Sequence, residues 1–330
     1  MHYSLPLVAA LASIASAHGV VTSIQGANGV SMPGLSIADG TPRDCSTNSC
    51  GSQADTSIIR DREINSGECG PLGRTQGNGP VSAETMIRNF MGEGAAPRND
   101  GASESVGVED DIPNNINQRK RHQRRQLGGV LGGLVNDLTG TGQDSKGGAL
   151  GGLLGGLTGG GNGATGIGGL LGGGGDKSNG PPESSVAASA GVGATEGLPT
   201  CADDGTITMT YRQINQDGAG PLRASVDGTS GGTDANAFQT AEVTQDVPGL
   251  GIQGLSLATN TEFPLKVRMP EGMTCDATVA GVENVCVVRV RNGAAAGPFG
   301  GSAAFTQSPA ARKRAIAFRL KKRMEFNNRS

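Results

Sequence analysis

The residue with the most distinctive chemical setting is His18. An apolar run from Leu5 to Ile14 is followed by Ala15-Ser16-Ala17, the small-residue pattern at which secretory signal peptides are cut. Cleavage after Ala17 would make His18 the first residue, so that its α-amine and its imidazole could bind one metal ion together. We therefore predict a signal peptide over residues 1–17, a secreted protein that is extracellular or cell-wall associated, and His18 as the candidate metal ligand.

A metal site at His18 would need a further ligand. Copper-dependent polysaccharide oxygenases, which the start of the mature chain resembles, combine an N-terminal His with a second His on a β-sandwich. The only other His in the mature chain is His122, in a basic tract. Tyr211 and Arg212 lie on a predicted strand, but arginine does not ligate copper in practice. Copper binding, and a copper-dependent oxygenase centred on His18, are therefore the alternative hypothesis, and the leading expectation is that no cofactor is bound.

The cysteines divide evenly around a Gly-rich tract. An even number of cysteines in a secreted chain predicts disulfides, although the sequence does not choose the pairing. Three cysteines on each side cannot all pair within their own half, so complete oxidation among the six predicts at least one bridge across the tract. The six predicted disulfide residues are Cys45, Cys50, Cys69, Cys201, Cys275 and Cys286.

The tract itself, residues 113–197, is predicted to be a disordered insertion. Glycine loses the most backbone entropy on ordering, and the tract carries too little side-chain surface to offset that loss. Near its start lies a basic cluster that resembles the dibasic sites of secretory-pathway proteases, which cut most readily in exposed loops. A solvated run of charges explains the cluster equally well. The predicted processing residues are Lys120, Arg121, Arg124 and Arg125.

The flanks of the insertion carry the fold. Apolar residues alternate over 18–26, 206–212, 263–269 and 285–291, which predicts strands, with Ile207, Met209 and Tyr211 on the inner face of one and Arg212 on the outer face. Residues 82–91 are typical of a short helix with Ser82 as its cap. We predict a mostly β, disulfide-bonded, sandwich-like single domain with one short helix, formed by residues 18–112 and 198–309.

The C-terminal tail, residues 310–330, has a different character. Ser308-Pro309 fits a helix cap followed by the first helical residue. Ile316, Leu320 and Met324 recur at helical spacing among basic residues, so a helix is expected there. Such a helix could dock or lie in solvent, or it could bind a membrane surface, because basic amphipathic segments are attracted to anionic surfaces.

The remaining chemistry is unremarkable. Net charge is −3, so no general attraction to nucleic acid is expected. The Gly runs lack the Lys and Ser or Thr of a phosphate-binding loop. Carboxylates are present, but context marks no pair as an acid and base, and turns or surface charge explain them. The polar turn over 215–221 could be a recognition loop, although a structural turn is the simpler interpretation.

Several longer strings stand out on both flanks of the insertion: His18–Val21, Asp39–Cys45, Arg60–Ile64, Gly73–Pro80, Val106–Asp110, Arg212–Pro221 and Gly300–Arg314. Together they resemble one family, the appressorium-specific secreted proteins of plant- and insect-pathogenic fungi. The resemblance covers both flanks of the insertion and implies secretion during host penetration and a role in virulence. It implies no reaction and no catalytic residues, so the catalytic residues stay unknown.

The leading hypothesis is a non-catalytic effector that acts at the host surface or on a fungal cell-wall component. The copper-dependent oxygenase is the enzyme alternative, and a membrane-active basic tail is a third hypothesis.

Overall fold

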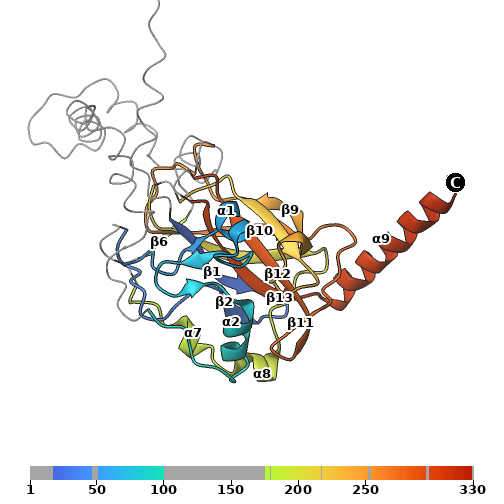
Figure 1. Ribbon diagram of the computed structural model, residues 1–330, viewed down its shortest axis with the longest axis horizontal. Coiled ribbons are helices and arrows are strands. Elements are labelled where there is room, and N and C mark those ends of the chain that lie inside the picture. Colours follow the sequence, from blue (N-terminus) through green and yellow to red (C-terminus); the bar gives the residue numbers. More distant parts are fainter. Residues whose placement is uncertain are drawn as a thin grey trace, which may run out of the picture.

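Strands from the two sides of the insertion build one sheet, as a computed structural model of the chain shows (Figure 1). The structure describes residues 18–46, 51–99, 175–178, 180–216, 218–251, 254–294 and 297–328. The first part contains β1 (Gly19–Gln25), β2 (Ser31–Pro33), β3 (Ser57–Ile58), α1 (Asp61–Ser66), β4 (Arg74–Thr75), β5 (Gly79–Pro80) and α2 (Ala83–Phe90). The second part contains β6 (Asp176–Lys177), α7 (Ser185–Ala188), α8 (Val192–Glu196), β7 (Thr206–Gln213), β8 (Arg223–Asp227), the short 3-10 helix η3 (Ala235–Ala237), β9 (Phe238–Gln245), β10 (Thr261–Arg268), β11 (Ala277–Val279), β12 (Val282–Arg291), β13 (Phe299–Thr306) and α9 (Pro309–Asn327).

The strand order interleaves these two parts. It runs β2-β1-β7-β10-β9-β8-β12-β13-β3-β4-β5, with β11 beside β12 and β6 beside β10. Strands of the first part therefore lie at both ends of this order, and strands of the second part lie between them. Antiparallel ladders join the parts twice, between β1 and β7 and between β3 and β13. Backbone hydrogen bonds between distant segments thus hold the two flanks in one domain.

The sheet turns back on itself at β9, which gives the molecule two layers. Residues 238–241 of β9 pair with β8, whereas residues 242–245 pair with β10. The turn places β1 against β13. A Cβ added at Gly301 would lie 2.7 Å from the backbone nitrogen of Val21, so this close approach requires glycine. The predicted mostly β, sandwich-like architecture is confirmed.

Alternation along the strands fills the core between the layers. In β7 the side chains of Ile207, Met209 and Tyr211 are buried, and the threonines between them are half-buried. Strand β10 repeats the pattern with buried Leu265 and Val267. The chain has no Trp, so Phe, Met, Val and Ile provide the bulk of the core. Each strand contributes one apolar row because successive side chains point to opposite faces.

The predicted helix is confirmed as α2, with Met86, Ile87 and Phe90 buried. Ser82 occupies the cap position, but its side chain makes no capping hydrogen bond. The expected C-terminal helix is confirmed as α9 with Ser308 as its cap, and the helices α1, α7 and α8 were not expected. In Figure 1, α7 and α8 lie beside α2, and α9 projects from the body with the C-terminus at its far end. Across the described ranges, no helix is both long enough and apolar enough to cross a membrane.

The boundary of the insertion differs from the predicted one. Residues 180–197 were assigned to the disordered tract, but they form α7 and α8. Both helices contact α2, and the backbone nitrogen of Gly191 donates to the carbonyl oxygen of Asn89. Composition misled because this segment is rich in Gly, Ala and Ser, yet Val186 is fully buried. Residues 100–174, with the candidate processing residues Lys120, Arg121, Arg124 and Arg125, lie outside the described residues, as do the predicted signal peptide with Ala17 and residue Cys50.

The cysteines also depart from the prediction. Cys275 and Cys286 form a disulfide within the second part of the chain. Cys45 is disulfide-bonded, whereas Cys69 and Cys201 carry free, buried thiols. The expected bridge across the insertion is therefore not formed by Cys69 or Cys201. The parity argument was wrong in its premise that all six cysteines pair with one another.

Cleavage of the chain after Arg125 tests this arrangement. We expect the two fragments to elute together from a sizing column, because the β1–β7 and β3–β13 ladders hold them. In SDS without reductant they should separate, because Cys69 and Cys201 are free and the Cys275–Cys286 bridge lies in one fragment. A single band that splits only on reduction would contradict the structure.

Candidate functional site

His18 lies at the start of β1 and is fully buried. Its backbone nitrogen donates to Oδ1 of Asn215 at 2.6 Å, and its Nδ1 lies 3.3 Å from Nδ2 of the same side chain. The imidazole packs on Phe299, with ring centroids 4.4 Å apart. Asn215 follows β7, so the residue that the sequence singled out is held by both layers of the sandwich.

The surroundings of His18 give the copper hypothesis no support. Within the described part of the chain, no group of three or more His, Cys, Asp or Glu residues is placed to hold a metal ion. His122, the only other mature His, lies outside the described residues. Tyr211 is buried, and its hydroxyl donates to the carbonyl oxygen of Gly218. That hydroxyl therefore serves the turn after β7.

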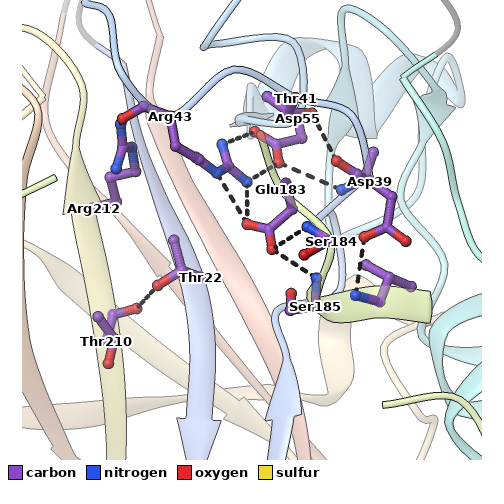
Figure 2. A network of polar contacts seen from close by, with 12 residues as sticks. Thr22, Asp39, Thr41, Arg43, Asp55, Glu183, Ser184, Ser185, Thr210 and Arg212 are labelled. Atoms are coloured by element: carbon purple, nitrogen blue, oxygen red, sulfur yellow. Dashed lines mark hydrogen bonds and ion pairs between the residues drawn. The ribbon is translucent and has the colours of Figure 1, made fainter. Parts of the chain in front are cut away.

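A different group of residues forms the most elaborate polar site of the described chain, centred on Arg43 (Figure 2). The guanidinium makes two hydrogen bonds to Asp55, at 3.1 and 2.5 Å. It makes two more to Oε2 of Glu183, at 3.0 and 2.8 Å. The Arg43 and Asp55 side chains are 6% and 0% exposed, and that of Glu183 is 13% exposed. One arginine thus joins carboxylates from the two sides of the insertion.

The loop that carries Arg43 also contacts the chain shortly before and shortly after residues 100–174, which we call the gap. We call residues 39–43 the clamp loop. Its Asp39 exchanges backbone hydrogen bonds with Pro97 and Asn99, just before the gap. Gly40 and Thr41 exchange backbone hydrogen bonds with Glu183, shortly after it. One loop therefore binds described segments on both sides of residues 100–174.

The clamp loop also caps α7, the first helix after the gap. The carboxylate of Asp39 accepts hydrogen bonds from the backbone nitrogens of Val186 and Ala187, at 3.0 and 2.8 Å. These donors belong to the first turn of α7, where backbone N–H groups have no partner within the helix. An acidic residue from the first part of the chain thus caps a helix of the second part.

Arg212 ties the clamp loop to the sheet. The sequence placed its side chain on the outer face of β7, but it is fully buried. Its Nη2 donates to the carbonyl oxygen of Arg43 and to Oδ1 of Asn260, and its Nη1 lies 3.8 Å from Glu262. The clamp loop covers this end of β7, which is why the alternation of the strand predicted the wrong environment.

The electrostatics follow from this burial. Burial lowers the pKa of Arg212 to about 10, and the positive charge of Arg43 acts in the same direction. Burial would also lower the pKa of Arg43, but the carboxylates of Asp55 and Glu183 raise it above its ordinary value. For Glu183, burial would raise the pKa, but Arg43 and the hydrogen bonds from Ser185 outweigh burial and lower it. Arg43, Arg212 and Glu183 are therefore charged at neutral pH.

A second network of the same kind surrounds Glu63 of α1. Its carboxylate, 3% exposed, accepts hydrogen bonds from Arg60 at 2.8 Å and from Arg74 of β4 at 3.0 Å. Nearby, Arg291 of β12 binds Asp61 at 2.6 Å. Short elements with few apolar side chains are thus fastened to the sheet by ion pairs.

These networks explain what the family-like strings do in this structure. Asp39–Cys45 contains the clamp loop and meets Arg212–Pro221 through the contact between Arg43 and Arg212. Arg60–Ile64 meets Gly73–Pro80 through the contact between Glu63 and Arg74. Both arrangements position backbone segments. The sequence offered one signal for them, a high density of Arg, Asp and Glu in turn-rich strings, but it did not show which charges meet.

The comparisons with known proteins agree with the resemblance. The Egh16-like virulence factor family matches residues 16–300. The appressoria-specific virulence factor GAS2 of Pyricularia oryzae is 47% identical over 312 residues, which cover 93% of this chain and 89% of that protein. The chain belongs to the Egh16-like virulence factor family. It is accordingly a virulence-associated fungal protein.

A further member of this set matches a shorter segment. The appressoria-specific virulence factor GAS1 of Pyricularia oryzae is 39% identical over 129 residues, or 38% of this chain and 50% of that protein. No solved structure matches the chain. The family match ends at residue 300, before α9 begins.

Substitution of Glu183 by Gln tests the clamp. We expect a loss of about 2 kcal/mol in the free energy of unfolding at pH 7, because a charged hydrogen-bond partner of Arg43 is lost. The lowered pKa of Glu183 means that its stabilisation is complete above the ordinary value of 4.5 and is lost as the pH falls through the lowered value. The difference between wild type and variant should therefore shrink in acid. Urea unfolding followed by circular dichroism measures it, since the chain has no Trp.

Glu196→Gln is the matched control, because Glu196 is an exposed residue at the end of α8. It should unfold like wild type at both pH values. Asp55→Asn should cost more than Glu183→Gln, about 3–5 kcal/mol, because it leaves part of a buried ion pair uncompensated. A Glu183→Gln variant as stable as wild type at neutral pH would contradict the assignment.

Proposed function

We propose that this protein is secreted and acts without catalysis at the fungal cell wall or the host surface during host penetration. The observation that carries the proposal is the use made of the charged residues in the family-like strings. Arg43, Glu63 and Arg212 of these strings are buried and hold backbone segments together. Charged side chains that are fixed in this way favour a rigid domain that acts by presenting its surface to a partner.

The N-terminal sequence supports the proposed location. The apolar run and Ala15-Ser16-Ala17 fit a cleaved signal, and the Cys275–Cys286 disulfide suits an oxidising compartment. The relatives named appressoria-specific virulence factors support action during infection. The partner is a component of the fungal wall or of the host surface, and nucleic acid is not expected.

Complementation of a fungal strain that lacks the gene tests the proposal. The full chain should appear in the medium or wall with His18 as its first residue and should restore host penetration. A chain without residues 2–17 should stay inside the cell and fail to restore it. Intact mass and peptide mapping of the secreted protein report the first residue.

His18→Ala separates this function from copper chemistry. Secreted at the wild-type level, the variant should restore penetration fully, and purified wild-type protein should take up no stoichiometric copper in a titration. Tight copper binding that disappears in His18→Ala, together with lost penetration at equal secretion, would reject the non-catalytic function in favour of the oxygenase.

A further inference from the structure

Most of helix α9 makes few contacts with the rest of the described domain. Its N-terminal end is well anchored. The Ser308 hydroxyl accepts a hydrogen bond from the backbone nitrogen of Ala311 and donates one to Asp203. Arg312 binds the carbonyl oxygen of Cys275 and the carboxylate of Asp276. Beyond this base the helix leaves the body, as Figure 1 shows.

The projecting part carries an exposed apolar row. Ile316, Leu320 and Met324 follow one another at intervals of four residues and so lie along one side of the helix. Their exposed fractions rise toward the free end, from 45% to 53% and 61%, and Phe326 reaches 72%. Together with Leu250 and Leu257, these four are the large apolar side chains that the described surface exposes most.

The same helix concentrates positive charge. It contains seven basic residues and one acidic residue, in a protein whose net charge is −3. Arg319 and Arg323 stand three positions after Ile316 and Leu320, and therefore border the apolar row. Six of the basic side chains are exposed: Lys313, Arg314, Arg319, Lys321, Lys322 and Arg323.

A groove between the helix and the domain repeats this chemistry. It has a volume of about 580 Å³ and opens beneath the far half of α9. Its walls combine aromatic and aliphatic groups with cations, although Glu271 contributes one carboxylate. The apolar groups are Phe318, Phe326 and Met273, and the cations are Arg319, Lys322 and Arg323.

We propose that α9 binds an anionic lipid surface, with Ile316, Leu320 and Met324 in the acyl boundary and the bordering cations on the headgroups. The apolar row is short on an otherwise polar helix, so attraction of the Lys and Arg side chains to anionic headgroups would supply most of the binding, and the row would insert at the acyl boundary. An acidic polysaccharide would satisfy the cations but would leave the apolar row in water. A second copy of the helix would oppose like charges. The lipid surface satisfies both features at once.

The exposed apolar row starts at Ile316, beyond residue 300, where the family match ends. It gives the proposed function a place of action, a lipid membrane at the host surface, and so rests partly on that proposal. Binding to lipid in vitro does not depend on secretion or on virulence, so the two proposals fail separately.

Vesicle co-sedimentation with the full mature chain tests the inference. We expect binding to phosphatidylcholine vesicles that contain about three parts in ten phosphatidylserine, and little binding to phosphatidylcholine alone. The triple variant Ile316→Ser, Leu320→Ser, Met324→Ser should bind at least about tenfold more weakly. The pair Arg319→Glu, Arg323→Glu should weaken binding by about tenfold or more, and salt should weaken wild-type binding.

The matched control reverses two exposed charges elsewhere, Arg62→Glu and Arg223→Glu, for the same change in net charge. It should bind like wild type. Hydrogen exchange should slow over residues 319–327 when vesicles are added. Each variant should fold normally because the altered side chains are exposed, and circular dichroism checks this.

Four results would overturn the inference. They are no vesicle binding by wild type, binding that the control pair weakens equally, and binding that survives loss of the apolar row. The fourth is a stable dimer of the wild type that the triple variant abolishes in the absence of lipid binding.

Discussion

The structure depends on the ion pairs that Arg43 makes with Asp55 and Glu183. Asp55 precedes residues 100–174 and Glu183 follows them, so one guanidinium binds two segments that lie far apart in the sequence. The carbonyl oxygen of the same residue accepts from Arg212 of β7. Around it, Asp39 bonds the segment before the gap and caps α7 after it. One loop therefore fixes described residues on both sides of the insertion.

A buried ion pair contributes less to net stability than its distances suggest, because both charges lose their water. Its stronger effect is on arrangement. Removal of one partner leaves the other charge buried and unpaired, so alternative placements of these loops are penalised. This effect matters here because several strands of the first part are short and carry few apolar residues. β3, β4 and β5 have two residues each, and networks around Glu63 and Arg43 fix the turns between and beside them.

Much of the fold could be predicted from the pattern of the sequence. The rows of Ile207, Met209 and Tyr211 and of Leu265 and Val267 predicted their strands, because a period of two directly reports one buried face. The helix over 82–91 and the cap at Ser308 could also be predicted, because both depend on residues that are close together in the sequence. Membership of the family could be inferred from continuous strings, which need no tertiary information.

The failures share a cause, which is dependence on distant contacts. Arg212 is buried because the clamp loop covers it, and nothing local to β7 reports that loop. Residues 180–197 fold because Asp39 caps α7, although their composition resembles a linker. The even number of cysteines predicted that all six form disulfides, but Cys69 and Cys201 carry free thiols. His18 attracted attention by its position at a cleavage signal, whereas the structure uses its backbone and ring to join β1 to Asn215 and Phe299.

The central claim is that a non-covalent clamp unites segments from both sides of the insertion. A double-mutant cycle of Arg43→Met and Glu183→Gln measures that contact most directly, through the free energies of unfolding of the four proteins. We predict a coupling energy of about 1.5–3 kcal/mol that persists after the chain is cut within the insertion. A coupling energy near zero, in the intact or the cut chain, would contradict it.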